Sequence, residues 1–179
     1  MAVNGTPAPA PLIVTATLPA EIFAWADRLR RAHFPPERNH LPAHVTLFHA
    51  LPPSAEGEIG RLLASLASDP PPPARLAQII SLGSGTALLI ESPAMLSLRE
   101  MIAERFHGML SAQDAGRPRL HITIQNKVTS REAKALQAVL AADFQPRSFL
   151  FAGLGLDRYR GGPWEEAGRW RFRGAARRA

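Results

Sequence analysis

Hydrophobic and polar residues alternate along the chain in two different rhythms. Segments with a two-residue period predict strands, because successive side chains of a strand point to opposite faces. Segments with apolar residues three and four positions apart predict amphipathic helices. In chain order, these segments predict the succession β-α-β-α-β-β-α-β-α-β-β. The strands are expected at 12–18, 44–51, 75–82, 86–90, 120–128, 147–159 and 164–172, and the helices at 19–31, 54–67, 92–110 and 129–142.

Prolines and glycines mark the boundaries between these segments. The proline pair at 52–53 ends the second predicted strand, and Ser54 is placed to cap the helix that follows. The Gly-Ser-Gly turn at 83–85 joins two strands into a hairpin. The chain is thus expected to consist of a mobile leader at 1–11, a single bilobal domain at 12–173 and a solvated basic tail at 174–179.

Two of the predicted strands carry the same pattern of histidine, apolar residue, threonine and apolar residue. The copies begin at His44 and His121, a little under half the chain apart, and each is followed by a helix. Residues two positions apart on a strand share a face, so Thr46 should lie beside His44 and Thr123 beside His121. The matching order indicates two similar lobes whose motif strands meet across a cleft.

A pair of imidazoles suits acid–base chemistry, because the unperturbed pKa of histidine lies near neutrality. At a phosphodiester, one ring removes a proton from an attacking hydroxyl or water, and the other protonates the departing oxygen from the opposite side of phosphorus. Each threonine hydroxyl can donate to a non-bridging oxygen as charge builds there. We therefore expect His44, Thr46, His121 and Thr123 to be catalytic, with neither a metal ion nor a cofactor.

The same alternation extends beyond each motif and provides candidates for substrate binding. Phe48 is expected on the face of His44 and Thr46, where its ring could stack on a base, although a place in the core is the alternative. Gln125 and Lys127 are expected on the face of His121 and could hold phosphate. For Lys127, simple solvation at the strand end is the alternative.

Composition narrows the class of protein without identifying it. The 179 residues suffice for one domain with a substantial core, and 46% of them are hydrophobic. The formal net charge of +6 favours phosphate-bearing partners, although a bias towards arginine alone would also produce it. The absence of cysteine excludes disulfides and thiolate metal sites. It also suits a reducing cytoplasm, where we expect the protein to be a monomer. No apolar run is long enough for a membrane span, so we expect no membrane attachment.

The paired motif resembles that of the two-histidine (2H) phosphoesterases, which include the bacterial 2′,5′ RNA ligase-like proteins and the RNA cyclic phosphodiesterases. The resemblance covers most of the chain, from about 12 to 172. It implies a bilobal α+β fold, with two lobes of antiparallel sheet flanked by helices and the motifs lining a central groove. It also implies metal-independent phosphodiesterase activity on RNA ends or nucleotides with 2′,3′-cyclic or 2′,5′ linkages. The first motif continues with Phe48-His49-Ala50 instead of the Phe-Leu-Gly of the RNA ligase-like branch, and the second continues with Gln125-Asn126-Lys127. These departures indicate a different branch of the family.

Three other interpretations remain open from the sequence. Ligation of 2′,5′ ends is the same chemistry in reverse. A non-catalytic RNA- or nucleotide-binding module would keep the cleft and lose turnover. A metal site could use His40, His44 and His49, but Pro42 breaks any helix between the first two, and simple alternation places His49 on the face opposite His44.

Overall fold

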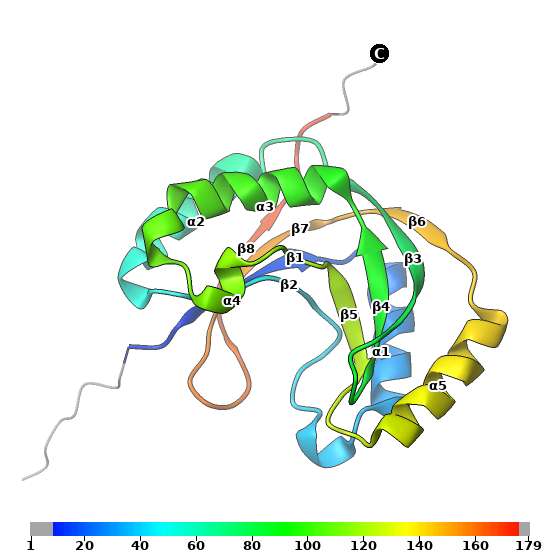
Figure 1. Ribbon diagram of the computed structural model, residues 1–179. Coiled ribbons are helices and arrows are strands. Elements are labelled where there is room, and N and C mark those ends of the chain that lie inside the picture. The colour runs from blue at the N-terminus through cyan, green and yellow to red at the C-terminus, as the bar shows by residue number, and fades with distance from the viewer. Residues whose placement is uncertain (1–8, 176–179) are drawn as a thin grey trace, which may run out of the picture.

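The computed structural model describes residues 9–175, which form two four-stranded antiparallel sheets flanked by helices (Figure 1). The bilobal α+β fold expected from the sequence is confirmed. The elements are β1 (Leu12–Thr17), α1 (Ala20–His33), β2 (Val45–Leu51), α2 (Glu56–Leu66), β3 (Pro73–Ser81), β4 (Thr86–Glu91), α3 (Pro93–Arg105), α4 (Ala112–Ala115), β5 (His121–Gln125), α5 (Ser130–Asp143), β6 (Arg147–Leu150), β7 (Gly153–Arg158) and β8 (Glu165–Arg171), with short 3₁₀ turns at Pro36–Arg38, Pro53–Ala55 and His107–Met109.

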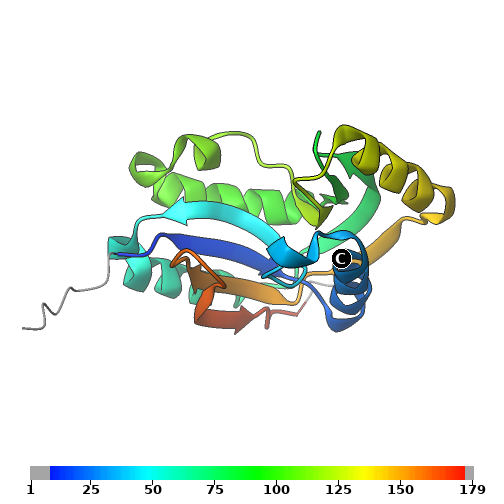
Figure 2. The ribbon, with the colours of Figure 1, turned by 90° about the horizontal axis from the view of Figure 1, so that it is seen from below.

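The two motif strands occupy equivalent positions in different sheets. The first sheet has the strand order β2-β1-β7-β8, which Figure 2 shows side by side, and the second has the order β5-β4-β3-β6. Both motif strands, β2 and β5, are therefore edge strands, and they contact each other between the lobes. An edge strand leaves one row of backbone groups without a partner in its own sheet. Those rows are available to the loops and helices that join the two lobes.

The segment predicted as one strand at 147–159 is two strands in different sheets. β6 pairs with β3 in the second sheet, whereas β7 pairs with β1 and β8 in the first. Phe151 and Ala152 make the crossing, and their amides donate to the carbonyls of Pro72 at 3.0 Å and Thr17 at 2.8 Å. A continuous apolar run does not show which partner each half will pair with, so this division could not be read from periodicity.

Helix ends also differ from the sequence prediction. Ser54 does not cap α2: it lies inside the 3₁₀ turn that runs directly into the helix, and Ala55 holds the N-cap position without a side-chain hydrogen bond. Thr129 caps α5 and forms a reciprocal capping box with Glu132. Part of the loop expected before the second motif folds as α4. These differences leave the order of the larger elements as predicted.

One hydrophobic core extends beneath both sheets and holds the motif strands in place. Each large aliphatic side chain that is fully buried contributes about 1.5–3 kcal/mol relative to exposure. The largest fully buried side chains are Phe48, Phe151, Leu12, Leu47, Leu51, Ile59, Leu63, Leu76, Leu88, Met95, Ile102 and Ile122.

None of the helices within residues 9–175 is long and apolar enough to span a bilayer.

The predicted leader and tail lie mostly outside the described residues, at 1–8 and 176–179. The described ends are attached to the fold. Ala10 is buried, and the Gly174 amide donates to the Asp69 carbonyl at 3.1 Å. Ala10, from the predicted leader, and Gly174, from the predicted tail, therefore make contacts with the domain.

Candidate active site

The two motif histidines make the same hydrogen bond. In His44, Nδ1 donates to the carbonyl of Pro42 at 2.8 Å, and in His121, Nδ1 donates to the carbonyl of Arg119 at 2.6 Å. A carbonyl oxygen can only accept, so Nδ1 carries the proton in both rings. Nε2 is then the nitrogen that can exchange a proton with a ligand, in each lobe. His44, directly before β2, and His121, the first residue of β5, thus present imidazoles in the same tautomer.

The surroundings of His44 favour its neutral form. Burial lowers the pKa of His44 to about 4, and the hydrogen bond to Pro42 offsets part of this effect. The positive charges of Arg30, His121 and His49 lower it further, so all of these groups are near enough to act on the His44 ring. At neutral pH, His44 is therefore a proton acceptor with the other motif histidine in its vicinity.

The motif histidines and threonines are all half-buried, whereas Val45 and Ile122 between them are buried, which is the alternation of a strand. Thr46 and Thr123 are both half-buried, and they pair with Thr15 of β1 and Ala87 of β4. Their apolar neighbours in the motifs are buried in the core. Within residues 9–175, no hydrogen bond engages either threonine hydroxyl. Both hydroxyls are therefore free to donate to a ligand.

Phe48 does not share the face of His44 and Thr46. The register between β1 and β2 shifts on both sides of Val14, so strict alternation fails and Leu47 and Phe48 are both buried. The Phe48 ring is 0% exposed and lies under the Arg99 guanidinium, 4.5 Å away. Of the two interpretations, the core position is the one observed. No surface of this ring is available for stacking on a base.

The shift in register also changes the place of His49. Because β2 has one extra residue at each of the two register shifts, Leu47 and Phe48 are buried in succession, and His49 lies on the more exposed side of the strand. Its ring donates to the buried Asp114 carboxylate at 3.1 Å. The position of His49 does not support the metal interpretation, because no group of three His, Cys, Asp or Glu residues within 9–175 could hold a metal ion.

The other predicted binding residues have separate positions. Gln125 is buried and accepts a hydrogen bond from Thr86 at 3.4 Å, because the register between β4 and β5 shifts at this point. The Gln125 side chain therefore lies in the interior, against β4, and not on the face of His121. Lys127 is exposed, with a φ of 58°, and lines a hollow that also contains His44 and Thr123. Lys127 alone of the three is placed where it can meet a ligand.

Two hollows meet at His44. The smaller, of about 360 Å³, lies between the lobes and is lined by Arg30, Thr123 and Lys127 among others. The larger, of about 850 Å³, extends over the first sheet. Trp164 borders both, and its ring lies 4.8 Å from that of His44 at an interplanar angle of 58°. Volumes of this size suit small-molecule ligands such as nucleotides.

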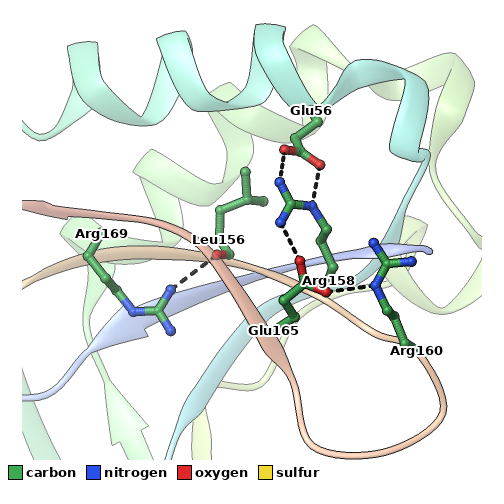
Figure 3. A network of polar contacts seen from close by, with 6 residues as sticks. All are labelled: Glu56, Leu156, Arg158, Arg160, Glu165 and Arg169. Atoms are coloured by element: carbon green, nitrogen blue, oxygen red, sulfur yellow. Dashed lines mark hydrogen bonds and ion pairs between the residues drawn. The ribbon is translucent and has the colours of Figure 1, made fainter. Parts of the chain in front are cut away.

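Ion pairs hold the hairpin that carries Trp164. Arg158, at the end of β7, pairs with Glu56 at the start of α2 and with Glu165 at the start of β8, and Glu165 also accepts from Arg160 (Figure 3). The network joins both ends of the hairpin loop to α2. Trp164 immediately precedes Glu165, so its position over His44 depends on this anchorage.

The sequence analysis missed Arg30, Trp164 and Asp114. Arg30 had a usable signal, because it continues the helical spacing of Ile22 and Ala26 and is buried with them. A positively charged side chain on the apolar face of a helix is unusual unless it has a functional role or a hydrogen-bonding partner. Trp164 and Asp114 had no such signal, since nothing in their neighbourhoods distinguishes them from ordinary turn residues.

The fold and the paired histidines define a two-histidine phosphoesterase-type protein. The family model of the 2′-5′ RNA ligase superfamily matches residues 18–163, and the chain belongs to this family. Among curated proteins, no sequence matches the chain.

Solved structures of the same fold are similar over nearly their whole lengths. The protein TT0787 of Thermus thermophilus has a TM-score of 0.60 at 18% identity, covering 93% of this chain and 100% of that one. A protein described as a phosphoesterase has a TM-score of 0.58 at 20% identity, covering 92% and 98%. Escherichia coli LigT in complex with NADP⁺ has a TM-score of 0.56 at 22% identity, covering 92% and 99%. At these identities the likeness establishes the fold.

Proposed function

We propose that the protein is a phosphodiesterase that acts on nucleotides or RNA ends with a 2′,3′-cyclic phosphate or a 2′,5′ linkage. One observation carries the proposal: His44 and His121 have matched Nδ1–carbonyl hydrogen bonds at the edges of two different sheets. This arrangement leaves a reactive Nε2 in each lobe. Acid–base catalysis at phosphorus needs two such groups on opposite sides of the scissile bond.

The proposed hydrolysis needs only this chain's residues and water. One histidine accepts a proton from water as the water oxygen bonds to phosphorus. The other histidine donates a proton to the ribose oxygen whose bond to phosphorus breaks, which gives a ring-opened phosphomonoester. Thr46 and Thr123 donate to the non-bridging oxygens, where negative charge increases in the transition state. Each histidine is expected to contribute about 10²–10⁴-fold to the rate.

Nucleotide substrates are supported by the hollows and by the structural relatives. Escherichia coli LigT has been solved with NADP⁺ and, at a TM-score of 0.51, with 3′-AMP. The hollows around His44 contain aromatic and cationic side chains, which suit bases and phosphates. Trp164 replaces Phe48 as the candidate for base stacking, and Lys127 remains a candidate for phosphate binding.

A turnover assay with a panel of substrates tests this proposal. The protein is incubated in EDTA with 2′,3′-cyclic nucleotides, cyclic-ended oligonucleotides and 2′,5′-linked dinucleotides, and the products are separated. We expect ring opening or cleavage that EDTA does not inhibit. Loss of turnover in EDTA, restored by added metal, would contradict the mechanism. Nucleotide binding without any product would favour the binding module, and joining of 2′,5′ ends would favour the ligase.

A further inference from the structure

Arg30 is a buried cation between the two motifs. It extends from α1, is 4% exposed, and its guanidinium lies 4.2 Å from the centre of the Phe34 ring. Nε donates to Asn39 Oδ1 and to the Leu41 carbonyl, both at 2.9 Å. Nη1 donates to the carbonyl of Thr123 at 2.8 Å, 93 positions further along the chain. One side chain thus joins the loop leading to His44 with the second motif strand.

Within residues 9–175, no carboxylate neutralises this guanidinium by direct contact. Asp27, the acidic residue whose charge acts on it, accepts instead from the Ala43 amide at 2.9 Å and pairs with Arg31 at 3.1 Å. Burial lowers the pKa of Arg30, but an arginine stays protonated at neutral pH. A buried cation bound only to neutral carbonyl oxygens is costly, and an anionic ligand would offset that cost.

The remaining nitrogen of Arg30 has no hydrogen-bond partner in the described part of the chain and is not fully buried. Nη2 has no hydrogen-bond partner within residues 9–175, and no fully buried side-chain nitrogen or oxygen in this part of the chain lacks a partner. Nη2 is therefore accessible. Arg30 lines the smaller hollow together with His44, Thr123 and Lys127. The side chain that carries this donor thus lines the same hollow as the motif residues His44 and Thr123.

We propose that Nη2 of Arg30 binds a non-bridging oxygen of the substrate phosphoryl group. This inference rests on the proposed function and adds a charged phosphate ligand that neither motif contains. The three hydrogen bonds of Nε and Nη1 fix the guanidinium plane, so the remaining donor is preorganised for an anion. Its positive charge also opposes the negative charge that develops at phosphorus.

Nucleotide binding by matched variants tests the proposal. Calorimetry would compare 3′-AMP binding by the wild type, Arg30→Met, Arg30→Lys and Arg28→Met. Arg28 is exposed on the same helix, so its variant controls for the loss of one positive charge. We expect Arg30→Met to weaken binding about 10–100-fold, the size of one or two charged hydrogen bonds. The affinity of Arg30→Lys for 3′-AMP should lie between those of the wild type and Arg30→Met, and Arg28→Met should change the affinity less than twofold. Equal losses for the Met variants would overturn the proposal.

A wild-type measurement covers the case in which Arg30→Met does not fold. In ¹⁵N-labelled wild-type protein, the side-chain nitrogens of Arg30 should shift on titration with inorganic phosphate. An unchanged Arg30 signal at saturating phosphate would overturn the proposal. The cyclic-phosphate assay in EDTA is run in parallel. Turnover without any Arg30 response would leave the proposed function standing, whereas an Arg30 response without turnover would support the phosphate site and contradict the phosphodiesterase.

Discussion

The carboxylate of Asp114 holds the edge of the first motif strand through His49. It accepts from the His49 amide at 2.8 Å, the His49 ring at 3.1 Å and the Ala50 amide at 2.9 Å. Arg99 completes the contact by donating to the carbonyls of Leu47 at 2.9 Å and Asp114 at 2.6 Å. Asp114 lies in α4, and residues 116–120 join α4 to β5. These hydrogen bonds therefore tie the segment that precedes the second motif strand to the edge of the first.

Replacing Asp114 with asparagine should destabilise the protein and weaken catalysis. The side chain is 0% exposed, so the amide would leave buried donors without an acceptor. We expect the free energy of unfolding to fall by about 3 kcal/mol. In the folded fraction, kcat should fall because the motif strands lose their common anchor. Urea unfolding and single-turnover rates measure the two effects, and Glu104→Gln, at an exposed position of α3, provides the control. Unchanged stability would show that the contact is dispensable.

The same carboxylate should make stability depend on pH in the acid range. Burial raises the pKa of Asp114, but hydrogen bonds from the His49 ring and the two amides outweigh this and bring it from an ordinary 3.8 to about 2. Since the folded pKa is depressed, the contribution is complete above pH 4 and is lost as pH falls through 2. The loss should be about 2 kcal/mol. Between pH 5 and 2, the free energy of unfolding should therefore fall more steeply with decreasing pH in the wild type than in Asp114→Asn.

Removing either motif histidine should abolish turnover while preserving the fold. His44→Ala and His121→Ala should each lower kcat by about 10²–10⁴-fold, because each removes one proton-transfer partner. The double variant should be only slightly slower than the slower single variant, since acid and base act as a unit. Circular dichroism and 3′-AMP affinity provide the controls, and His107→Ala, at an exposed position, should retain full activity. Full turnover in both single variants would refute the assignment.

His44 should make the protein less stable as the solution is acidified from neutrality. Its pKa is lowered from 6.5 to about 4 by burial, so between these values the unfolded chain binds the proton more readily than the folded one. Stability is therefore complete above about pH 6.5 and decreases as pH falls towards 4. His44→Gln should lack this component. The difference in the free energy of unfolding between the wild type and His44→Gln, measured as a function of pH, isolates this component. A difference that does not change with pH would contradict the lowered pKa. An NMR titration of the ring gives the pKa directly.

Trp164 should maintain the low pKa of His44. The indole lies 4.8 Å from the imidazole, and burial is the leading cause of the lowered pKa. Trp164→Ala should expose the ring and raise its pKa towards 6.5, and it should also weaken nucleotide binding if the indole stacks on a base. Arg158→Gln, which disrupts the ion pairs in Figure 3, should have the same effects to a smaller extent. An unchanged His44 titration in Trp164→Ala would show that other side chains bury the ring.

Local patterns in the sequence determine much of the fold. The β3–β4 hairpin follows from its glycine turn, α1 from its apolar spacing, and α5 from its cap at Thr129. The two His-x-Thr motifs also predict where the histidines and threonines lie, because alternation holds over these short stretches. All of these features depend on residues within a few positions of one another.

Contacts between distant segments decide the remainder of the candidate site. Phe48 turned into the core and Gln125 towards Thr86 because shifts in strand register interrupt the alternation, and register depends on the partner strand. The bond from Arg30 to Thr123 and the position of Trp164 over His44 join residues far apart in the chain. The sequence by itself thus determined the positions of the paired motif histidines, whereas the groups around them were decided by the packing of the two lobes. Periodicity describes one strand or helix at a time, but a binding site is formed where several of them meet.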